Sequence, residues 1–421
     1  MMAGLSIYSV RKQDEQITLI LKKRLASILP DAMRVANLDM WLILCQEDNL
    51  DPVFQTMIPL NTWTPILQML VFSMEPAGKT VEGVNLSMTD TTDLYQRPWQ
   101  GRATGEQWQL LVEIIKQQDP QSIGINIGSV NWAAGGLTHN LYTQLLSVLP
   151  DGYQQRLVSA EAACNHWLMT LTGEELEIMT QAALISKQVI AQCYSPQAIK
   201  PGVTTTTDLE WAYWQKVVDL GLQPCFKPYF NLVRSPAKTA IHPVADKVIL
   251  AGDMIHCDVG LRYMRLCSDH QEWAYVLEPG ENDAPQGLKN LFTQSGRLQK
   301  VYMQSFEQGL SGNQLLARIL SRANTENIPH PKIYSHSLGY YLHEPGPLIG
   351  LPWEQTGVPG RGDVLLRPNS CFTMELSIED SVPEWDNQLV RFSTEQDVKF
   401  TEAGCEPLGS VQTGFYLVPG R

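Results

Sequence analysis

The sequence predicts an α/β protein of two domains, in which an α/β domain precedes a larger domain built on half-buried strands. Its 421 residues exceed the roughly 100–200 residues of a typical single domain. In the first part, short apolar runs alternate with helical patterns, which is typical of α/β folds. In the second part, apolar and polar residues alternate with a period of two, which indicates strands buried on one face. We expect the domains to span 1–165 and 166–421.

The first domain is expected to begin with an amphipathic helix over 16–35. Short apolar runs bounded by polar residues then favour buried strands over 40–45, 66–74 and 122–128. A helical pattern covers 106–117, between the second and third of these strands. This domain contains no cluster of residues with catalytic chemistry. We therefore interpret it as a scaffold, a gate for substrate or a subunit contact.

The second domain is expected to open with helices over about 160–195 and 207–221, which Pro-Gly separates. Three later segments, 254–260, 371–378 and 393–400, show the period-two pattern of half-buried strands. Each of them presents an acidic side chain on its polar face. This second part of the chain is therefore where a functional site is expected.

Composition and charge exclude several classes of protein. A content of 44% hydrophobic and 18% charged residues is that of a globular chain, not a disordered one. The formal net charge of −13 makes nucleic acid or an anionic membrane surface a poor partner, because both attract basic patches. No apolar run reaches the roughly 18–20 residues of a membrane helix. The eight cysteines form no C-x-x-C pair, which favours reduced thiols.

The expected cellular location follows from the N-terminal residues and from the cysteines, which we expect to be reduced. Residues 1–25 have no apolar segment ahead of their charges, so no signal peptide is expected. We expect a cytoplasmic protein, and a periplasmic or secreted one would require a leader that precedes this sequence.

Four carboxylates and one histidine carry the candidate chemistry. Asp258 and Asp269 would meet on one face if the segment between them folds as a hairpin, and Glu375 and Glu395 lie on two further strands. Two such charges about 4 Å apart repel by about 4 kcal/mol at an effective dielectric constant near 20, and cations would reverse this cost. With the imidazole of His336, these donors suit Mn²⁺, Co²⁺, Zn²⁺ or Fe²⁺, and four carboxylates can bridge two ions.

The order and spacing of these residues resemble the pita-bread metallopeptidases, which include methionine aminopeptidase, aminopeptidase P and prolidase. The resemblance covers about residues 170–410 and is carried by the phrases LAGDMIHCDVG, HSLGYYLHEPG, FTMEL and EQDVKFTEAGCEPL. It implies a curved, mainly antiparallel sheet flanked by helices. The stretch INIGSVNWAAGGLTHNLYTQLL resembles the N-terminal domain of the prolidase, aminopeptidase P and creatinase branch. Methionine aminopeptidases lack that domain and match less well.

The resemblance implies a dinuclear peptidase that cleaves Xaa-Pro bonds, as a dipeptidase or an aminopeptidase, with a hydroxide shared by two ions. Asp269 and Glu395 would bridge the ions, of which Mn²⁺ is the first choice. Glu375 would also act as general base, and His242 and His343 would face the substrate. A homodimer is implied as well. The implied metal ligands are Asp258, Asp269, His336, Glu375 and Glu395.

Several positions depart from the family pattern and leave alternatives open. His270 and Gln271 stand where the family often has Thr-Arg, Ser393 stands where a substrate-holding Arg is common, and Ser335 replaces a Gly. These departures leave the metal ligands intact but weaken the case for proline peptides. One alternative is a metal-dependent hydrolase or lyase of the same fold that acts on a small non-peptide substrate. Another is a non-catalytic module that binds peptides. We interpret His256 as a packing residue.

Overall fold

The computed structural model of the protein describes residues 7–420, except residues 92, 100 and 102. Contacts divide the chain into two units, Tyr8–Thr172 and Gly173–Arg421, and Ile7 goes with the second. Across the described residues, no helix combines the length and the apolar character that crossing a bilayer requires.

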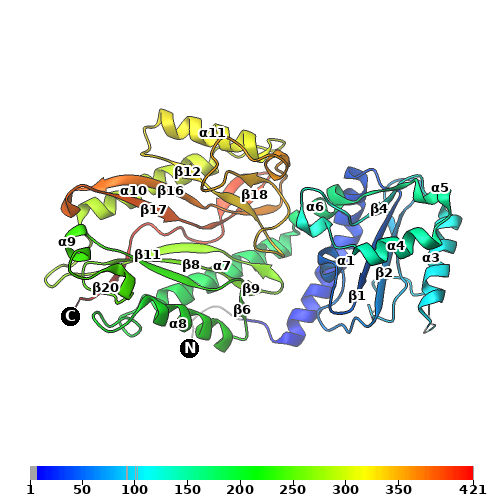
Figure 1. Ribbon diagram of the computed structural model, residues 1–421, viewed down its shortest axis with the longest axis horizontal. Coiled ribbons are helices and arrows are strands. Elements are labelled where there is room, and N and C mark those ends of the chain that lie inside the picture. Colours follow the sequence, from blue (N-terminus) through cyan, green and yellow to red (C-terminus); the bar gives the residue numbers. More distant parts are fainter. Residues whose placement is uncertain (1–6, 92, 100, 102, 421) are drawn as a thin grey trace. The chain divides into compact units, whose positions relative to one another are not determined.

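The first unit is a five-stranded sheet with helices packed around it (Figure 1). The strand order is β3-β2-β1-β4-β5, in which β1 pairs antiparallel with β2 and parallel with β4. All six residues of the run MWLILC are buried, because β1 is central and covered on both faces. The strands are β1 (Met40–Gln46), β2 (Leu67–Met74), β3 (Val81–Asn85), β4 (Ile123–Ile125) and β5 (Leu157–Ser159). The helices are α1 (Val10–Val35), α2 (Pro52–Thr56), α3 (Thr104–Gln118), α4 (His139–Val148), α5 (Asp151–Gln154) and α6 (Glu161–Met169).

The second unit places its sheets between helices α7 and α8 on one side and α10 and α11 on the other (Figure 1). Two of these helices begin with capping boxes, Thr205 with Asp208 and Ser311 with Gln314, which satisfy the first backbone N–H groups. The helices are α7 (Gly173–Cys193), α8 (Thr206–Asp219), α9 (Pro236–Thr239), α10 (Gln286–Met303) and α11 (Gly312–Thr325).

The strands of the second unit pair mostly antiparallel, in the orders β10-β9-β6, β20-β11-β8-β7, β12-β16-β17 and β14-β13-β15-β18-β19. The mixture of sheets and flanking helices confirms the predicted fold class. The first strands are β6 (Gln223–Pro224), β7 (Tyr229–Val233), β8 (Met254–Val259), β9 (Leu261–Tyr263), β10 (Leu266–Cys267), β11 (His270–Val276), β12 (Lys332–Ile333) and β13 (Ser335–Leu338). The others are β14 (Leu348–Ile349), β15 (Ser370–Thr373), β16 (Leu376–Val382), β17 (Gln388–Thr394), β18 (Asp397–Thr401), β19 (Gly404–Pro407) and β20 (Tyr416–Val418).

Two strands that we expected to be continuous are interrupted. The segment 371–378 splits into β15 and β16, which pair with β18 and β17 respectively, and Glu375 lies at the break. The segment 393–400 splits in the same way, and Glu395 lies between β17 and β18. The alternation of apolar and polar residues runs through both breaks, so the pattern alone could not reveal that the chain passes from one sheet to another.

An aromatic stack in the core supports the strands that carry the polar residues. The ring of Trp273 on β11 lies 4.7 Å from that of Phe392 on β17, and the two planes differ by 13°. Phe292 of α10 meets Phe392 edge-on at 4.8 Å. The imidazole of His256 on β8 packs 4.6 Å from Trp273 on the other side. Burial of these rings fixes β8, β11 and β17 relative to one another.

Candidate metal centre

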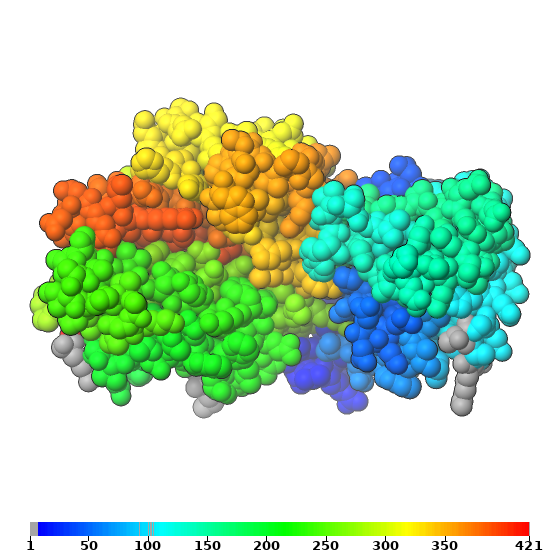
Figure 2. Space-filling view, in the orientation of Figure 1, coloured from blue at the N-terminus to red at the C-terminus, as the bar shows by residue number. Residues whose placement is uncertain are grey.

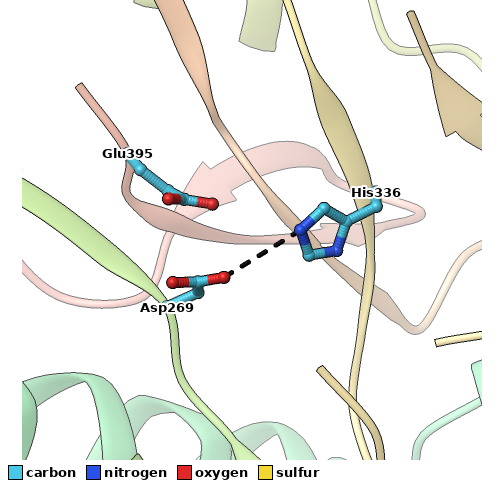
Figure 3. A group of neighbouring side chains, drawn as sticks. All are labelled: Asp269, His336 and Glu395. Atoms are coloured by element: carbon cyan, nitrogen blue, oxygen red, sulfur yellow. Dashed lines mark ion pairs between the residues drawn. The ribbon is translucent and has the colours of Figure 1, made fainter. Parts of the chain in front are cut away.

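Three of the five expected ligands gather in one buried group. Asp269 directly precedes β11, His336 lies on β13, and Glu395 lies between β17 and β18. One potential ligand atom from each lies within 4.8 Å of those of the other two. The Nε2 atom of His336 is 3.9 Å from Oδ2 of Asp269, and both carboxylates face the imidazole (Figure 3). The three side chains thus converge from strands far apart in the sequence.

The imidazole of His336 presents an unprotonated nitrogen to the group. Its Nδ1 atom lies 3.1 Å from the carbonyl oxygen of Ser337 and donates its proton there. That hydrogen bond leaves the lone pair of Nε2 directed at the carboxylates. Burial, followed by the charges of His343 and Arg361, lowers the pKa of His336 to about 3. The ring is therefore neutral at physiological pH, as a metal ligand must be.

Each of the two carboxylates of the group has one buried oxygen that the described residues leave without a hydrogen bond. Burial raises the pKa values of Asp269 and Glu395 well above their usual range, and the neighbouring acidic charges raise them further. Asp269 Oδ1 and Glu395 Oε1 are buried without a hydrogen-bond partner among the described residues. A divalent cation would supply both the missing charge and the missing contact, so these residues fit a metal ion.

Asp258 and Glu375 lie near this group but outside it. Asp258 is half-buried on β8, and burial raises its pKa to about 6. Burial, as the largest cause, raises the pKa of Glu375 to about 8, and the charge of Asp258 acts in the same direction. A hydrogen bond from Gln271 and the charge of Arg391 act in the opposite direction. The charges of Asp258 and Glu375 in turn raise the pKa values of Asp269 and Glu395. The proposed five-residue set is thus divided into three converging side chains and two neighbours.

Gly260 allows the two aspartate segments to approach each other. A Cβ atom at this position would lie 2.2 Å from the carbonyl oxygen of Ser268, the residue before Asp269. Only glycine fits where the chain leaves β8 so close to that backbone. This contact explains the glycine that follows Asp258 by two residues in the Asp-x-Gly phrase.

Gln271 joins the two glutamates through its amide group. Its Nε2 atom donates to Glu375 Oε1 at 2.9 Å and to Glu395 Oε2 at 2.8 Å. Its Oε1 atom lies 3.1 Å from Nε2 of His256, whose Nδ1 lies 2.9 Å from Asn231. Burial lowers the pKa of His256 to about 4, so the ring is neutral and donates from one nitrogen only, to the side-chain oxygen of either Gln271 or Asn231. His256 therefore packs against Trp273, as we interpreted it, and in addition contacts Gln271 through a hydrogen bond.

Replacing Gln271 with Ala is expected to weaken metal binding about ten- to hundredfold, because outer partners of metal ligands contribute this much to affinity. The substitution removes the donor that orients both glutamates. Titration calorimetry with Mn²⁺ measures the effect. Gln412→Ala is the matched control, because Gln412 bonds the backbone of Trp273 on the same strand and contacts neither glutamate. Equal Mn²⁺ affinity of Gln271→Ala and the parent would contradict the role of this amide.

Asp397 holds the backbone of Asp269 in place. Both of its carboxylate oxygens accept the backbone N–H of Asp269, at 3.1 and 3.3 Å. Burial raises the pKa of Asp397 well above its usual range. It lies outside the converging group, and its position two residues after Glu395 was the sequence signal that could have identified it.

The two histidines expected to face the substrate differ in their surroundings. The ring of His343 lies 4.4 Å from that of His336, and its Nε2 is 3.4 Å from the hydroxyl of Tyr334. Burial and Arg361 lower the pKa of His343. Like His343, His242 is exposed; it follows α9, and no hydrogen bond joins its imidazole to the described residues of the group. Its role stays a prediction.

A buried ion pair holds the backbone that carries His242. Arg234 contacts Asp253 with two bonds of 2.7 Å, and neither side chain is exposed. The same guanidinium donates to the carbonyl oxygen of His242 at 2.5 Å and to that of Val248 at 2.8 Å. The pair thus connects the end of β7 to the segment that leads into β8.

Asp253→Ala is expected to lower the free energy of unfolding by about 3–5 kcal/mol, because it leaves the Arg234 charge buried and uncompensated. Urea denaturation followed by circular dichroism measures this loss. Glu406→Ala is the control, since it breaks an exposed pair with Lys399 of 2.9 Å and should cost at most about 1 kcal/mol. A loss for Asp253→Ala no larger than that of the control would refute the argument.

Comparison with known proteins identifies the family and the fold of the chain. Residues 177–405 match the sequence model of Metallopeptidase family M24. The uncharacterized peptidase YqhT of Bacillus subtilis is 23% identical over 290 residues, which cover 68% of this chain and 73% of the relative. The X-Pro aminopeptidase of Thermotoga maritima has a similar structure, with a TM-score of 0.64, 17% identity and coverage of 92% and 100% of the two chains. The Xaa-Pro dipeptidase of Bacillus anthracis has a TM-score of 0.62, 18% identity and coverage of 95% and 100%. At such identities these structures show a shared fold.

Proposed function

The chain belongs to Metallopeptidase family M24, and from that premise we propose that it hydrolyses Xaa-Pro peptide bonds with two divalent metal ions. The convergence of Asp269, His336 and Glu395 carries this proposal, because it offers to a cation a neutral imidazole and two carboxylates that each have a buried oxygen without a hydrogen-bond partner. Asp258 and Glu375 would complete the ligand set. Mn²⁺ is the proposed ion. The homodimer and the cytoplasmic location stay predictions.

The bound ions would lower the pKa of a water molecule to about 7 and polarise the scissile carbonyl. Among the residues of this chain, Glu375 is the proposed proton carrier. Gln271 holds its Oε1 atom, which leaves Oε2 to accept a proton and to return it to the departing amine. A carboxylate whose environment favours its protonated form can carry out both steps near neutral pH.

His343 is the proposed donor to the oxygen of the reacting carbonyl. Its ring is neutral, because burial and Arg361 lower its pKa, and Tyr334 lies within 3.4 Å of its Nε2. A fixed donor that meets developing negative charge stabilises the transition state. We propose the same role for His242, whose exposed side chain would have to reach the substrate from the loop before β8.

The test is a substrate panel with the purified full chain. After chelation and addition of Mn²⁺, we expect hydrolysis of Ala-Pro or Ala-Pro-Ala and none of Ala-Ala. Preference for Ala-Pro would indicate a dipeptidase, and preference for Ala-Pro-Ala an aminopeptidase. Failure to cleave either proline peptide while Mn²⁺ is bound would refute the Xaa-Pro proposal and favour a non-peptide substrate, the alternative that Ser393 keeps open.

A further inference from the structure

A buried lysine contacts the strands of the candidate metal centre from the side of the helices. Lys187 lies on α7, which packs against β9, β10 and β11, and its side chain is only 12% exposed. Its Nζ atom donates to Oε1 of Glu272 on β11 and to Oε1 of Gln396, which lies between β17 and β18. On the face drawn in Figure 2, green atoms from the first part of this unit lie below orange-red atoms from its last strands. The lysine thus joins an early helix of the unit to a late strand.

The two acceptors of the lysine alternate along the chain with residues of the site. Gln271 and Glu395 lie opposite each other in a backbone bridge and exchange hydrogen bonds of 3.1 and 3.2 Å. Glu272 and Gln396 are the next residues along these two segments. Consecutive side chains of an extended chain point to opposite faces. Each side chain that faces the metal group is therefore followed by one that faces Lys187.

Gln396 connects this contact to both candidate glutamates. It directly follows Glu395, at the break where β17 ends and β18 begins. Its carbonyl oxygen accepts the backbone N–H of Met374 at 2.7 Å, and Met374 directly precedes Glu375. A shift of Gln396 would therefore move the backbone beside each of the two glutamates.

The same lysine balances a buried charge. Glu272 is 1% exposed, and its second carboxylate oxygen accepts the hydroxyl of Tyr416 at 2.8 Å. A hydrogen bond between an ammonium group and a carboxylate is about twice as strong as one between neutral groups. Removing Lys187 alone would leave the charge of Glu272 buried without compensation. An experiment on Lys187 must therefore separate lost folding from lost positioning.

We propose that Lys187 is a positioning residue for the metal centre. By holding Gln396 and Glu272, it fixes the backbone pairing that directs Gln271 and Glu395 toward the metal ions. This inference rests on the metal binding in the proposed function and not on its substrate. Partners beyond the direct ligands contribute about ten- to hundredfold to metal affinity. Lys187 acts through the neighbours of Gln271 and Glu395, so we expect an effect of about tenfold, at the lower end of that range.

The double variant Lys187→Met/Glu272→Gln tests this role, because it removes both charges of the pair and keeps the net charge of the parent. In titration calorimetry, we expect Mn²⁺ to bind the double variant about tenfold more weakly than the parent. The melting temperature of the metal-free protein should stay close to that of the parent, since no buried charge is left uncompensated. Lys399→Met/Glu406→Gln is the matched control, because it makes the same substitutions in an exposed pair of 2.9 Å on β18 and β19.

Gln396→Ala tests the path of the effect while the ion pair stays intact. It should weaken Mn²⁺ binding about as much as the double variant does. Combining all three substitutions should add little, because residues that act through one contact are not additive. Parent-like Mn²⁺ affinity of the double variant, or losses that add in full, would overturn the proposal. If the double variant does not fold, parent-like affinity of Gln396→Ala would overturn it equally.

Metal binding and hydrolysis distinguish this role from the proposed function. If the parent binds Mn²⁺ but cleaves no proline peptide, and both variants bind Mn²⁺ more weakly, the role of Lys187 stands and the Xaa-Pro function fails. If the parent cleaves proline peptides and both variants bind Mn²⁺ as tightly as the parent does, the function stands and the role fails. A parent that binds no Mn²⁺ would refute both.

Discussion

Asp269→Asn is expected to abolish metal-dependent hydrolysis, with a loss of at least about 10³-fold that added Mn²⁺ does not restore. A bound metal contributes several kcal/mol to the transition state, and each 1.36 kcal/mol is a factor of ten in rate. Asp269 contributes a buried oxygen without a hydrogen-bond partner to the group and faces His336 directly. The measurement is the rate of Xaa-Pro hydrolysis, with metal content determined by elemental analysis.

The same variant separates metal binding from folding. In the metal-free protein, Asp269 is a buried acid among other acids, and its pKa is raised well above the usual range. Removing it should leave the melting temperature of the metal-free protein unchanged or higher. Mn²⁺ should raise the melting temperature of the parent, because a ligand that binds only the folded state stabilises it, and should not raise that of the variant. Asp380→Asn, on β16 outside the group, is the control, and a variant that Mn²⁺ still stabilises would contradict the assignment.

The sequence was informative wherever a local pattern determines structure. The family resemblance is confirmed by the match over 177–405, and the α/β class by the sheets and helices observed. The helix expected over 16–35 lies within α1, and the strand expected over 40–45 lies within β1. These elements have unbroken apolar periodicity and are stabilised by burial of one face or both, so their positions can be inferred without knowledge of the rest of the fold.

The geometry of the site depends on contacts that no local pattern contains. Glu375 and Glu395 lie at breaks between strands, where the chain passes from one sheet to another. The position of Glu395 is fixed instead by Gln271, since the two residues exchange backbone hydrogen bonds of 3.1 and 3.2 Å. Hydrogen bonds to residues of other segments determine what Gln271, His256 and Asp397 do in the site. Such pairings become visible only when the register of each strand is known.

Glu375→Gln is expected to lower kcat about 10²–10⁴-fold, the usual contribution of a positioned acid–base group. A glutamine keeps the shape of the side chain, and its carbonyl oxygen can still accept from Gln271 Nε2, which lies 2.9 Å from the carboxylate. The amide cannot take a proton and return it, however. The three converging residues remain in place, so the variant should retain bound Mn²⁺ while it loses turnover.

The comparison of kcat with metal content determines which role Glu375 has. If it moves the proton, kcat falls while Mn²⁺ occupancy and KM change little, because the substrate and the group formed by Asp269, His336 and Glu395 are bound as before. If it acts only as a ligand, occupancy falls in step with activity and excess Mn²⁺ restores both. Glu406→Gln, an exposed glutamate on β19, is the control for loss of an acidic charge. Turnover by Glu375→Gln as fast as that of the parent would exclude both roles, because neither a proton carrier nor an essential ligand can be replaced without loss.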